Sequence, residues 1–286
     1  MSDPDPNLIN DILDGVKIPP APEILTSLNN ELQKDEPELG VLAGIIQRDA
    51  GLSALVIRTV NSPMFPLRSQ VSSIPQAISL LGIGYMINIV MGLVLRRSFD
   101  ADDRVLPGFW DSASNIAMVM SRVSRRVGGI ASDEAYMLGL FHNAGHSLIN
   151  QRFADYADFY RQHLNDPEGP ISLFEQARYN FDHATLGYYL ARSWGLPAEI
   201  CEVIRRHHEV EELLEQGDSI DGENPVARMA SVLKLAEHVD RLFHGVDEDH
   251  DWARSGLPVL SFLALSEPDY RELRDDMLDM LNTEAP

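Results

Sequence analysis

The sequence has little of several features that mark particular classes of protein. Its 286 residues include a single cysteine, Cys201, so no disulfide can form within the chain, as expected in a reducing cytosol. Because Cys201 lies on an apolar stretch, we interpret its thiol as a small buried group and not as a nucleophile. The first residues, MSDPDPNL, lack the basic and apolar regions of a secretory signal peptide. Together these absences predict a cytoplasmic protein.

Positive charge is also scarce. The chain has 23 Lys and Arg residues against 44 Asp and Glu residues, which gives a net charge of −21 at pH 7. A field of that sign repels nucleic-acid backbones and anionic membrane surfaces, so we expect neither as a partner. The paired arginines are too isolated to form a basic stripe, and we predict that they lie on solvated helix faces. These pairs are Arg96-Arg97, Arg125-Arg126 and Arg205-Arg206.

One segment, residues 74–95, contains no charged residue over a length close to the about 20 apolar residues that span a bilayer. Scattered polar residues dilute it, and we therefore predict a buried helix of a soluble domain from about Pro75 to Leu95. Gly82 and Gly84 should let neighbouring helices approach this helix closely, although each costs about 1 kcal/mol in helix propensity.

Signals for β-strands are nearly absent, whereas helix signals are frequent. Apolar residues recur at spacings of three and four along much of the chain. Ser73 precedes Gln76 by three residues, and Asp35 precedes Glu38 by three, which is the spacing of a helix-starting capping box. The sequence therefore predicts an all-α fold built as a multi-helix bundle.

The amino-acid composition changes around DADDRVLPGFW, where charged and turn-forming residues are frequent. We place a domain boundary near residue 105, between a small helical part at 17–105 and a larger helical part at 106–286. Within the larger part, the polar, acidic stretch EVEELLEQGDSIDGENP is predicted to be a mobile loop or linker. Further helices are expected near 225–243 and, as a last amphipathic helix, over EPDYRELRDDMLDMLN.

Four of the nine histidines lie on three separate predicted helices: His142, His183, His207 and His208. Helices packed as a bundle can direct such side chains to one interior point, where imidazole suits transition metals such as Zn, Fe, Ni or Cu. His142 and His146 are four residues apart and would share a helix face, a spacing that also arises by chance. Hydrogen-bonded packing inside the bundle remains the alternative for each of these residues.

The residue after His142 limits the chemistry of any such site. A two-metal hydrolytic centre needs a carboxylate whose charge bridges both ions and orients the attacking water. Asn143 stands at that place and offers one neutral carbonyl oxygen. The pattern therefore argues against two-metal hydrolysis, while leaving open one ion or a small ligand.

Several stretches, in order, resemble the HDOD domain, an output domain related to the HD and HD-GYP metal-dependent phosphohydrolases. They are VKIPPAPEILTSL, RDAGLSALVIRTVNSP, IPQAISLLGI, LGLFHNAGHSLI, HATLGYYLARSWGLPAEICEVIRRHH and LAEHVDRLF. The resemblance covers about residues 17–243. It implies a small amino-terminal helical subdomain followed by an HD-like helical domain, in a bacterial signal-transduction protein.

In the catalytic relatives, the metal ligands follow the order H…HD…H…HH…D. By position, the first histidine falls near Ser112, and the HD pair falls on His142-Asn143. The next ligands fall on His183 and on His207-His208, and the final aspartate falls near Glu237 or, as a weaker match, on Asp240. The resemblance thus implies that the histidines are kept, while the bridging aspartate and the first ligand are lost.

These residues favour a regulatory HDOD module with a degenerate, non-catalytic HD site and no catalytic residue. The site would bind one transition-metal ion, such as Fe, Zn, Ni or Mn, or a small-molecule or nucleotide ligand, and the module would contact other signalling proteins. The alternative is a metal-dependent phosphohydrolase acting on a nucleotide or a cyclic dinucleotide. A third hypothesis is a scaffold without a ligand, which would bind a partner through an apolar groove of the amino-terminal part.

Overall fold

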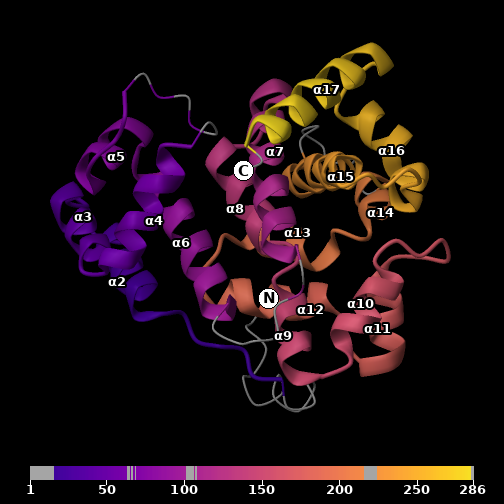
Figure 1. Ribbon diagram of the computed structural model, residues 1–286, viewed down its shortest axis with the longest axis horizontal. Coiled ribbons are helices and arrows are strands. Elements are labelled where there is room, and N and C mark those ends of the chain that lie inside the picture. The colour runs from indigo at the N-terminus through magenta and orange to yellow at the C-terminus, as the bar shows by residue number, and fades with distance from the viewer. Residues whose placement is uncertain are drawn as a thin grey trace.

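The computed structural model describes residues 16–62, 65, 67, 69–100, 106, 108–215 and 224–284. Within these residues all regular secondary structure is helical, which confirms the predicted all-α class (Figure 1). No described helix is by itself long and apolar enough to cross a membrane, although two short helices, Leu39–Gln47 and Ala50–Val60, meet those criteria together despite a bend of 114°.

The amino-terminal helices pack mainly on one another and lie together at the left of Figure 1. They are α2 (Glu23–Leu32), α3 (Leu39–Gln47), α4 (Ala50–Val60), α5 (Ile74–Leu81) and α6 (Ile83–Asp100). Helix α6 also packs against α8 (Ser132–Phe141), which joins this group to the rest of the protein. The boundary near residue 105 lies outside the described residues, so the division into two domains remains a prediction.

The long uncharged segment is two helices, so the prediction of one continuous helix is wrong. Gly82 ends α5 with a φ of 86°, a left-handed conformation that glycine adopts readily and that stops helix propagation. Side chains of α6 such as Met86 and Val90 are buried, as predicted. Gly84 does permit a close approach, because a Cβ there would lie 2.5 Å from an Asp133 carboxylate oxygen, whereas Gly82 has no such neighbour within 4 Å.

The two predicted capping boxes differ in outcome. Ser73 caps α5, since its Oγ accepts a hydrogen bond from the Gln76 backbone N–H at 3.4 Å. Asp35 does not cap α3, which begins four residues later. The buried Glu31 carboxylate instead accepts the Glu38 backbone N–H at 3.1 Å, and so supplies the acceptor that we expected from Asp35.

The larger group contains α7 to α17, of which α7, α8, α9, α12, α13 and α15 surround the site described below. The bounds are α7 (Phe109–Val127), α8 (Ser132–Phe141), α9 (Gly145–Arg152), α10 (Tyr156–His163), α11 (Ile171–Tyr179), α12 (His183–Ser193), α13 (Ala198–Arg206), α14 (Val210–Glu215), α15 (Pro225–Phe243), α16 (His250–Phe262) and α17 (Glu267–Glu284). Helix α15 packs against α7, α8, α13, α14, α16 and α17, so it forms the centre of this group. The predicted helices at 225–243 and at the carboxyl end are confirmed.

Two further expectations are settled by burial. Residues 210–215 of the predicted loop form α14, because Val210 and Leu213 bury their side chains against the bundle, so that part of the loop prediction is wrong. Residues 216–223 lie outside the described residues. The Cys201 side chain is fully buried, and burial raises the pKa of its thiol to about 11, as a packing role requires.

The start of the described chain is attached to the end of α12. The buried indole of Trp194 donates a hydrogen bond from Nε1 to the backbone carbonyl of Pro19 at 3.1 Å. The Ser193 hydroxyl contacts the same carbonyl at 3.4 Å. The extended segment that leads into α2 is therefore held against the larger group of helices.

Candidate metal centre

The stretch predicted to place His142 and His146 on one helix is interrupted. Helix α8 ends at Phe141 and α9 begins at Gly145, with a turn between them. A Cβ at Gly145 would lie 1.9 Å from the carbonyl oxygen of His183, so only glycine allows α9 to approach the start of α12 this closely. The prediction of a shared helix face is therefore wrong, but the turn brings both histidines to the same site. His146 stacks on His183 with ring centroids 3.7 Å apart.

Three histidines converge at the amino end of α12 and the carboxyl end of α13. The Nε2 atom of His183 lies 3.3 Å from Nε2 of His207 and 3.0 Å from Nε2 of His208. Among the described residues these three are one of the groups whose ligand atoms all lie within 4.8 Å of one another. We call His183, His207 and His208 the histidine cluster. The predicted fourth member, His142, lies beside it, with its ring centroid 5.7 Å from that of His207.

The far nitrogens of these rings are fixed by acceptors. Nδ1 of His183 lies 2.6 Å from a Glu175 carboxylate oxygen, and Nδ1 of His207 lies 2.8 Å from the Ile204 carbonyl. Nδ1 of His142 lies 2.7 Å from the Gly139 carbonyl. Because these oxygens can only accept, each Nδ1 donates, and in a neutral ring Nε2 then carries a lone pair.

The protonation states follow from burial and from the neighbouring charges. Burial, followed by repulsion from His183, lowers the pKa of His207 well below its usual value. Burial and then repulsion from His207 do the same for His208, and burial lowers the pKa of His142. Burial opposes charge on His183 as well, but the adjacent Glu175 carboxylate raises the pKa of His183 above its usual value.

Glu175, which the sequence analysis missed, is the buried anchor of this arrangement. Its carboxylate accepts the backbone N–H of His183 at 2.9 Å, the His183 ring N–H and the hydroxyl of Tyr156. Nδ1 of His146 lies 3.1 Å away. Burial works against the ionised form, but His183 and His146 lower the pKa of Glu175 far below its usual value. A carboxylate behind a histidine is the usual support for a metal-binding imidazole.

A second cluster of charges borders the histidines on α15. One Glu237 oxygen lies 3.6 Å from Nε2 of His142, and the other lies 2.8 Å from the Lys234 ammonium. That ammonium is also 2.9 Å from an Asp251 carboxylate oxygen. Burial disfavours the charged amine, but Glu237 and Asp251 raise the pKa of Lys234, so it carries a positive charge. The structure thus brings Glu237 to the site, and with it Lys234, which the sequence analysis did not consider.

The other two predicted positions lie further from the histidines. The Ser112 hydroxyl, at the expected place of a first ligand, donates to an Asp240 carboxylate oxygen at 2.5 Å. Asn115 donates to the second Asp240 oxygen at 2.9 Å. Both oxygens of Asp240 therefore accept hydrogen bonds from α7. Glu237 is the carboxylate that faces His142.

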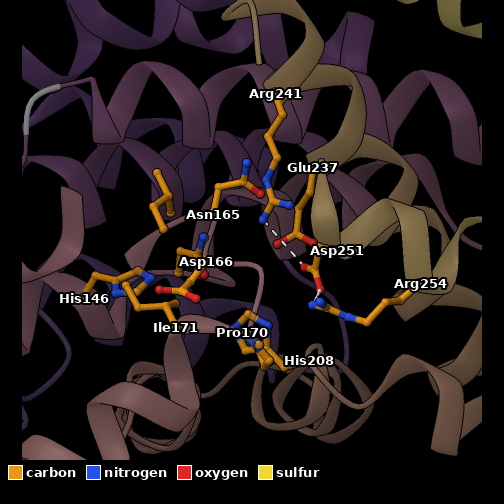
Figure 2. Close-up of a pocket in the computed structure, with 13 residues that line it drawn as sticks. His146, Asn165, Asp166, Pro170, Ile171, His208, Glu237, Arg241, Asp251 and Arg254 are labelled. Atoms are coloured by element: carbon orange, nitrogen blue, oxygen red, sulfur yellow. Dashed lines mark hydrogen bonds and ion pairs between the residues drawn. The ribbon is translucent and has the colours of Figure 1, made fainter. Parts of the chain in front are cut away.

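Several cavities reach this region. One, of about 380 Å³, is lined by residues that include Asp182 and His208. Another, of about 210 Å³, is lined by residues that include Ser112, Asn143 and Glu237. A smaller one, of about 30 Å³, is bordered by His146 and His208 on one side and by Glu237, Arg241 and Asp251 on the other (Figure 2). The buried side-chain amide oxygen of Asn143 has no hydrogen-bond partner among the described residues, and neither has Nε2 of His142.

The donor set fits a transition-metal ion. Two nitrogen ligands about 2.0–2.1 Å from a tetrahedral ion lie about 3.3 Å from each other. The separation of the His183 and His207 Nε2 atoms, 3.3 Å, has that value. Neutral imidazoles with their Nδ1 atoms engaged by Glu175 and Ile204 are the ligands that Zn and Fe accept. His142 Nε2 and Glu237 lie next to this set and could complete the coordination.

Solved structures share this architecture. An HDOD domain protein of unknown function from Geobacter sulfurreducens aligns over 98% of this chain and 97% of its own, with a TM-score of 0.70 and 18% identity. A candidate signal-transduction protein from Marinobacter aquaeolei gives a TM-score of 0.71 and 22% identity over 94% of this chain and 59% of its own. A candidate phosphohydrolase from Shewanella amazonensis gives 0.68 and 18% identity, covering 98% of each chain. These likenesses establish the fold.

Sequence comparison gives the family. An uncharacterised protein of Treponema pallidum (strain Nichols) is 21% identical over 192 residues, which is 67% of this chain and 37% of that protein. The chain therefore spans little more than a third of that relative's length. The HDOD domain matches residues 18–210, which is more than half of the chain. With the fold and the match in agreement, the chain belongs to the HDOD family.

Proposed function

We propose that this protein is a cytoplasmic regulatory module whose histidine cluster holds a single transition-metal ion, and that it does not catalyse two-metal phosphoester hydrolysis. The observation that carries the proposal is the convergence of the His207 and His208 Nε2 atoms, which lie within 3.3 Å of Nε2 of His183. Glu175 and Ile204 fix the opposite faces of two of these rings. When the three rings are neutral and protonated on Nδ1, their Nε2 lone pairs face one another and a cation can bind all of them.

Asn143 supports the non-catalytic part of the proposal. Its neutral amide sits where a bridging carboxylate would be needed, and its buried oxygen has no hydrogen-bond partner among the described residues. A neutral oxygen can act as a weak ligand or accept a hydrogen bond, but it cannot neutralise two divalent ions. The site is therefore suited to one ion.

A bound ion would supply a Lewis-acidic point beside His208, which lines a cavity of about 380 Å³ with room for a small ligand. The residues of the chain hold that point in place. His183 begins α12 and His207 follows the end of α13, so the ion would bind these two helices together, while Glu175 orients His183 from α11. Such a cross-link makes the packing of α11, α12 and α13 depend on the ion. A signalling partner would then distinguish the ion-bound from the ion-free packing of these helices.

Metal analysis tests the proposal directly. Chelator-treated protein is dialysed against Zn²⁺ or Co²⁺, and bound metal per chain is measured together with the Co²⁺ visible spectrum. We expect one ion per chain, with tetrahedral Co²⁺ bands that are lost in His183→Ala. The matched control is His250→Ala, which removes a histidine outside the cluster and should keep the ion. No bound ion at neutral pH would leave the histidines as hydrogen-bonded packing and refute the proposal.

One observation favours the alternative, a metal-dependent phosphohydrolase. The Glu237 carboxylate lies 3.6 Å from Nε2 of His142, so it could take the place of the missing aspartate. Its other oxygen, however, is paired with Lys234. We expect no turnover of a cyclic dinucleotide or of bis(p-nitrophenyl) phosphate with Mn²⁺, Fe²⁺ or Mg²⁺. Turnover at ordinary enzymatic rates that His142→Ala abolishes would establish the alternative.

A further inference from the structure

Lys234 is a lysine in the interior of the bundle. Its residue is 2% exposed on α15, and lysine is seldom buried so deeply unless its charge is paired. The ammonium lies 2.8 Å from Glu237 and 2.9 Å from Asp251, carboxylates that come from α15 and α16. It therefore holds together two acidic groups that would repel each other at the edge of the metal centre.

The charges around Lys234 are unevenly satisfied. Asp251 has Arg241 as a second cation and also pairs with the partly exposed Arg254 at 3.0 Å, whereas Asp249 pairs with Arg241. Figure 2 shows the Arg241 and Arg254 groups on either side of Asp251. Glu237 has the Lys234 ammonium on one oxygen and the unpartnered His142 Nε2 near the other. Lys234 thus makes a direct ion pair with Glu237, and the nearby Arg241 guanidinium adds electrostatic attraction.

Glu237, Asp251 and His142 Nε2 are also the kind of donors that bind a divalent cation. The 30 Å³ cavity lined by Glu237, Asp251 and His208 exceeds the about 10–15 Å³ that one water requires. Removing the Lys234 ammonium would free the place beside these two carboxylates and leave them without this cation. The ammonium and a second metal ion would therefore compete for the same groups.

We infer that the Lys234 ammonium stands in for a second divalent cation and thereby restricts the metal centre to one ion. This inference rests on the proposed one-ion function and names the residue that sets the number of ions. The charge balance agrees with it. Replacing Lys234 by a neutral residue removes one positive charge, and Asn143→Asp adds one negative charge, so the two changes together equal the charge of one divalent ion.

The test uses four full-length proteins: the wild type, Lys234→Met, Asn143→Asp and the double variant. Each is stripped of metal and then titrated with Zn²⁺ by equilibrium dialysis, with Co²⁺ absorption as a second readout. We expect one ion in the wild type and one in Asn143→Asp. Lys234→Met should bind a second ion at least tenfold more tightly than the wild type does, and the double variant should bind two ions more tightly still.

Two control variants separate charge from packing. Lys234→Arg keeps the positive charge and should hold one ion. Arg254→Gln removes a cation from the exposed rim and should also hold one ion. If Lys234→Met and the double variant each bind a single ion with wild-type affinity, the role of Lys234 is refuted and the one-ion function stands. If the wild type binds none while Lys234→Met gains an ion, the one-ion function fails and the role of Lys234 is supported.

If Lys234→Met does not fold without metal, because it leaves two largely buried carboxylates facing each other, refolding provides the measurement. Recovery of the helical circular dichroism only with Zn²⁺ or Co²⁺, at two ions per chain, would support the inference. Failure to fold with either ion, while Lys234→Arg folds normally, would show that a divalent cation cannot replace the ammonium and would refute the inference.

Discussion

The two halves of the site solve opposite electrostatic problems. In the histidine cluster, three imidazoles bring their Nε2 atoms close together, and burial lowers the pKa of His207 and His208. Around Lys234, carboxylates and cations alternate, and the buried charges are paired. One half therefore presents nitrogen ligands that a cation from solution could use, whereas the other carries its cation on its own side chain. The comparison indicates that the charge balance of a buried site depends as much on which positive charges are built in as on which ligands are present.

Removing Glu175 should have the largest effect, because it breaks the support of the histidine half. Glu175→Ala leaves the His183 ring, its backbone N–H and the Tyr156 hydroxyl without their buried acceptor. Loss of one partner from a buried charged pair costs about 3–5 kcal/mol. We expect a decrease of that size in the free energy of unfolding, measured in urea, and a metal affinity lower by about 10–100-fold. Glu175→Gln, which keeps one acceptor oxygen, should lie between the variant and the wild type, and equal stability of all three would contradict this role.

Gly145→Ala should act through geometry alone. The added methyl would lie 1.9 Å from the His183 carbonyl oxygen, so α9 must move away from α12. Overpacking of this kind costs about 1–3 kcal/mol, and it also displaces His142 and His146 from the cluster. The matched control is Gly40→Ala, where a Cβ meets nothing within 4 Å. Thermal unfolding that is unchanged in Gly145→Ala would show that the helices can separate without loss.

Acid should affect the two halves of the metal-free protein in different pH ranges. The folded-state pKa values of His207 and His208 are lowered, so the unfolded chain binds more protons than the folded protein below about pH 6.5. The free energy of unfolding therefore decreases as pH falls below that value. His183 has a raised pKa and opposes this trend, because its contribution is present below about pH 6.5 and is lost above its folded pKa.

On the Lys234 side, hydrogen bonds and charge pairing lower the pKa of Asp249 to about 2 against the effect of burial. Its contribution is present above about pH 3.9 and is lost as pH falls toward 2. Urea unfolding between pH 8 and pH 3 should therefore show a first decline below about pH 6.5 and a second below about pH 4. A single decline confined to the lower range would contradict neutral histidines in the cluster.

The smallest effect is expected at the rim. Arg254 pairs with Asp251 at 3.0 Å, but its side chain is 40% exposed, and exposed ion pairs contribute about 0–1 kcal/mol. Arg254→Gln should therefore change the free energy of unfolding by less than about 1 kcal/mol. Lys234→Gln should cost several times more, because its carboxylate partners are largely buried. Equal losses in the two variants would mean that the buried lysine is not essential to the charge pairing.

Much of the fold could be predicted because helix signals are local. The capping Ser73 and the helix at 225–243 are read from spacings within a few residues. The break at Gly82 was missed because a lone glycine in an apolar run is compatible with either a continuous helix or a left-handed end. Asp35 failed as a cap because Glu31, on the preceding helix, reaches the same N–H first.

The sequence analysis named the histidines that converge at the candidate site, but it did not name the buried charged residues Glu175 and Lys234. Histidines stand out because the chain has only nine, whereas Glu175 and Lys234 are single members of common residue types. Glu175 carried one usable signal, since it lies on the same helical face as Ile171 and Tyr179, four residues to either side, and both are buried. Lys234 pairs with Asp251 across 17 residues and a helix boundary, so its partner is visible only after α15 and α16 have packed.

The hydrogen bond from Trp194 to Pro19 gives α12 a mechanical property. The helix is 11 residues long, so it forms a stiff rod of about 16 Å. His183 stands at one end of this rod, and the tether to Pro19 is attached just beyond the other. A displacement of α12 along its axis at the histidine end is transmitted as tension or slack to the segment that enters α2. A movement at the candidate metal centre is thus coupled through α12 to the amino-terminal helices.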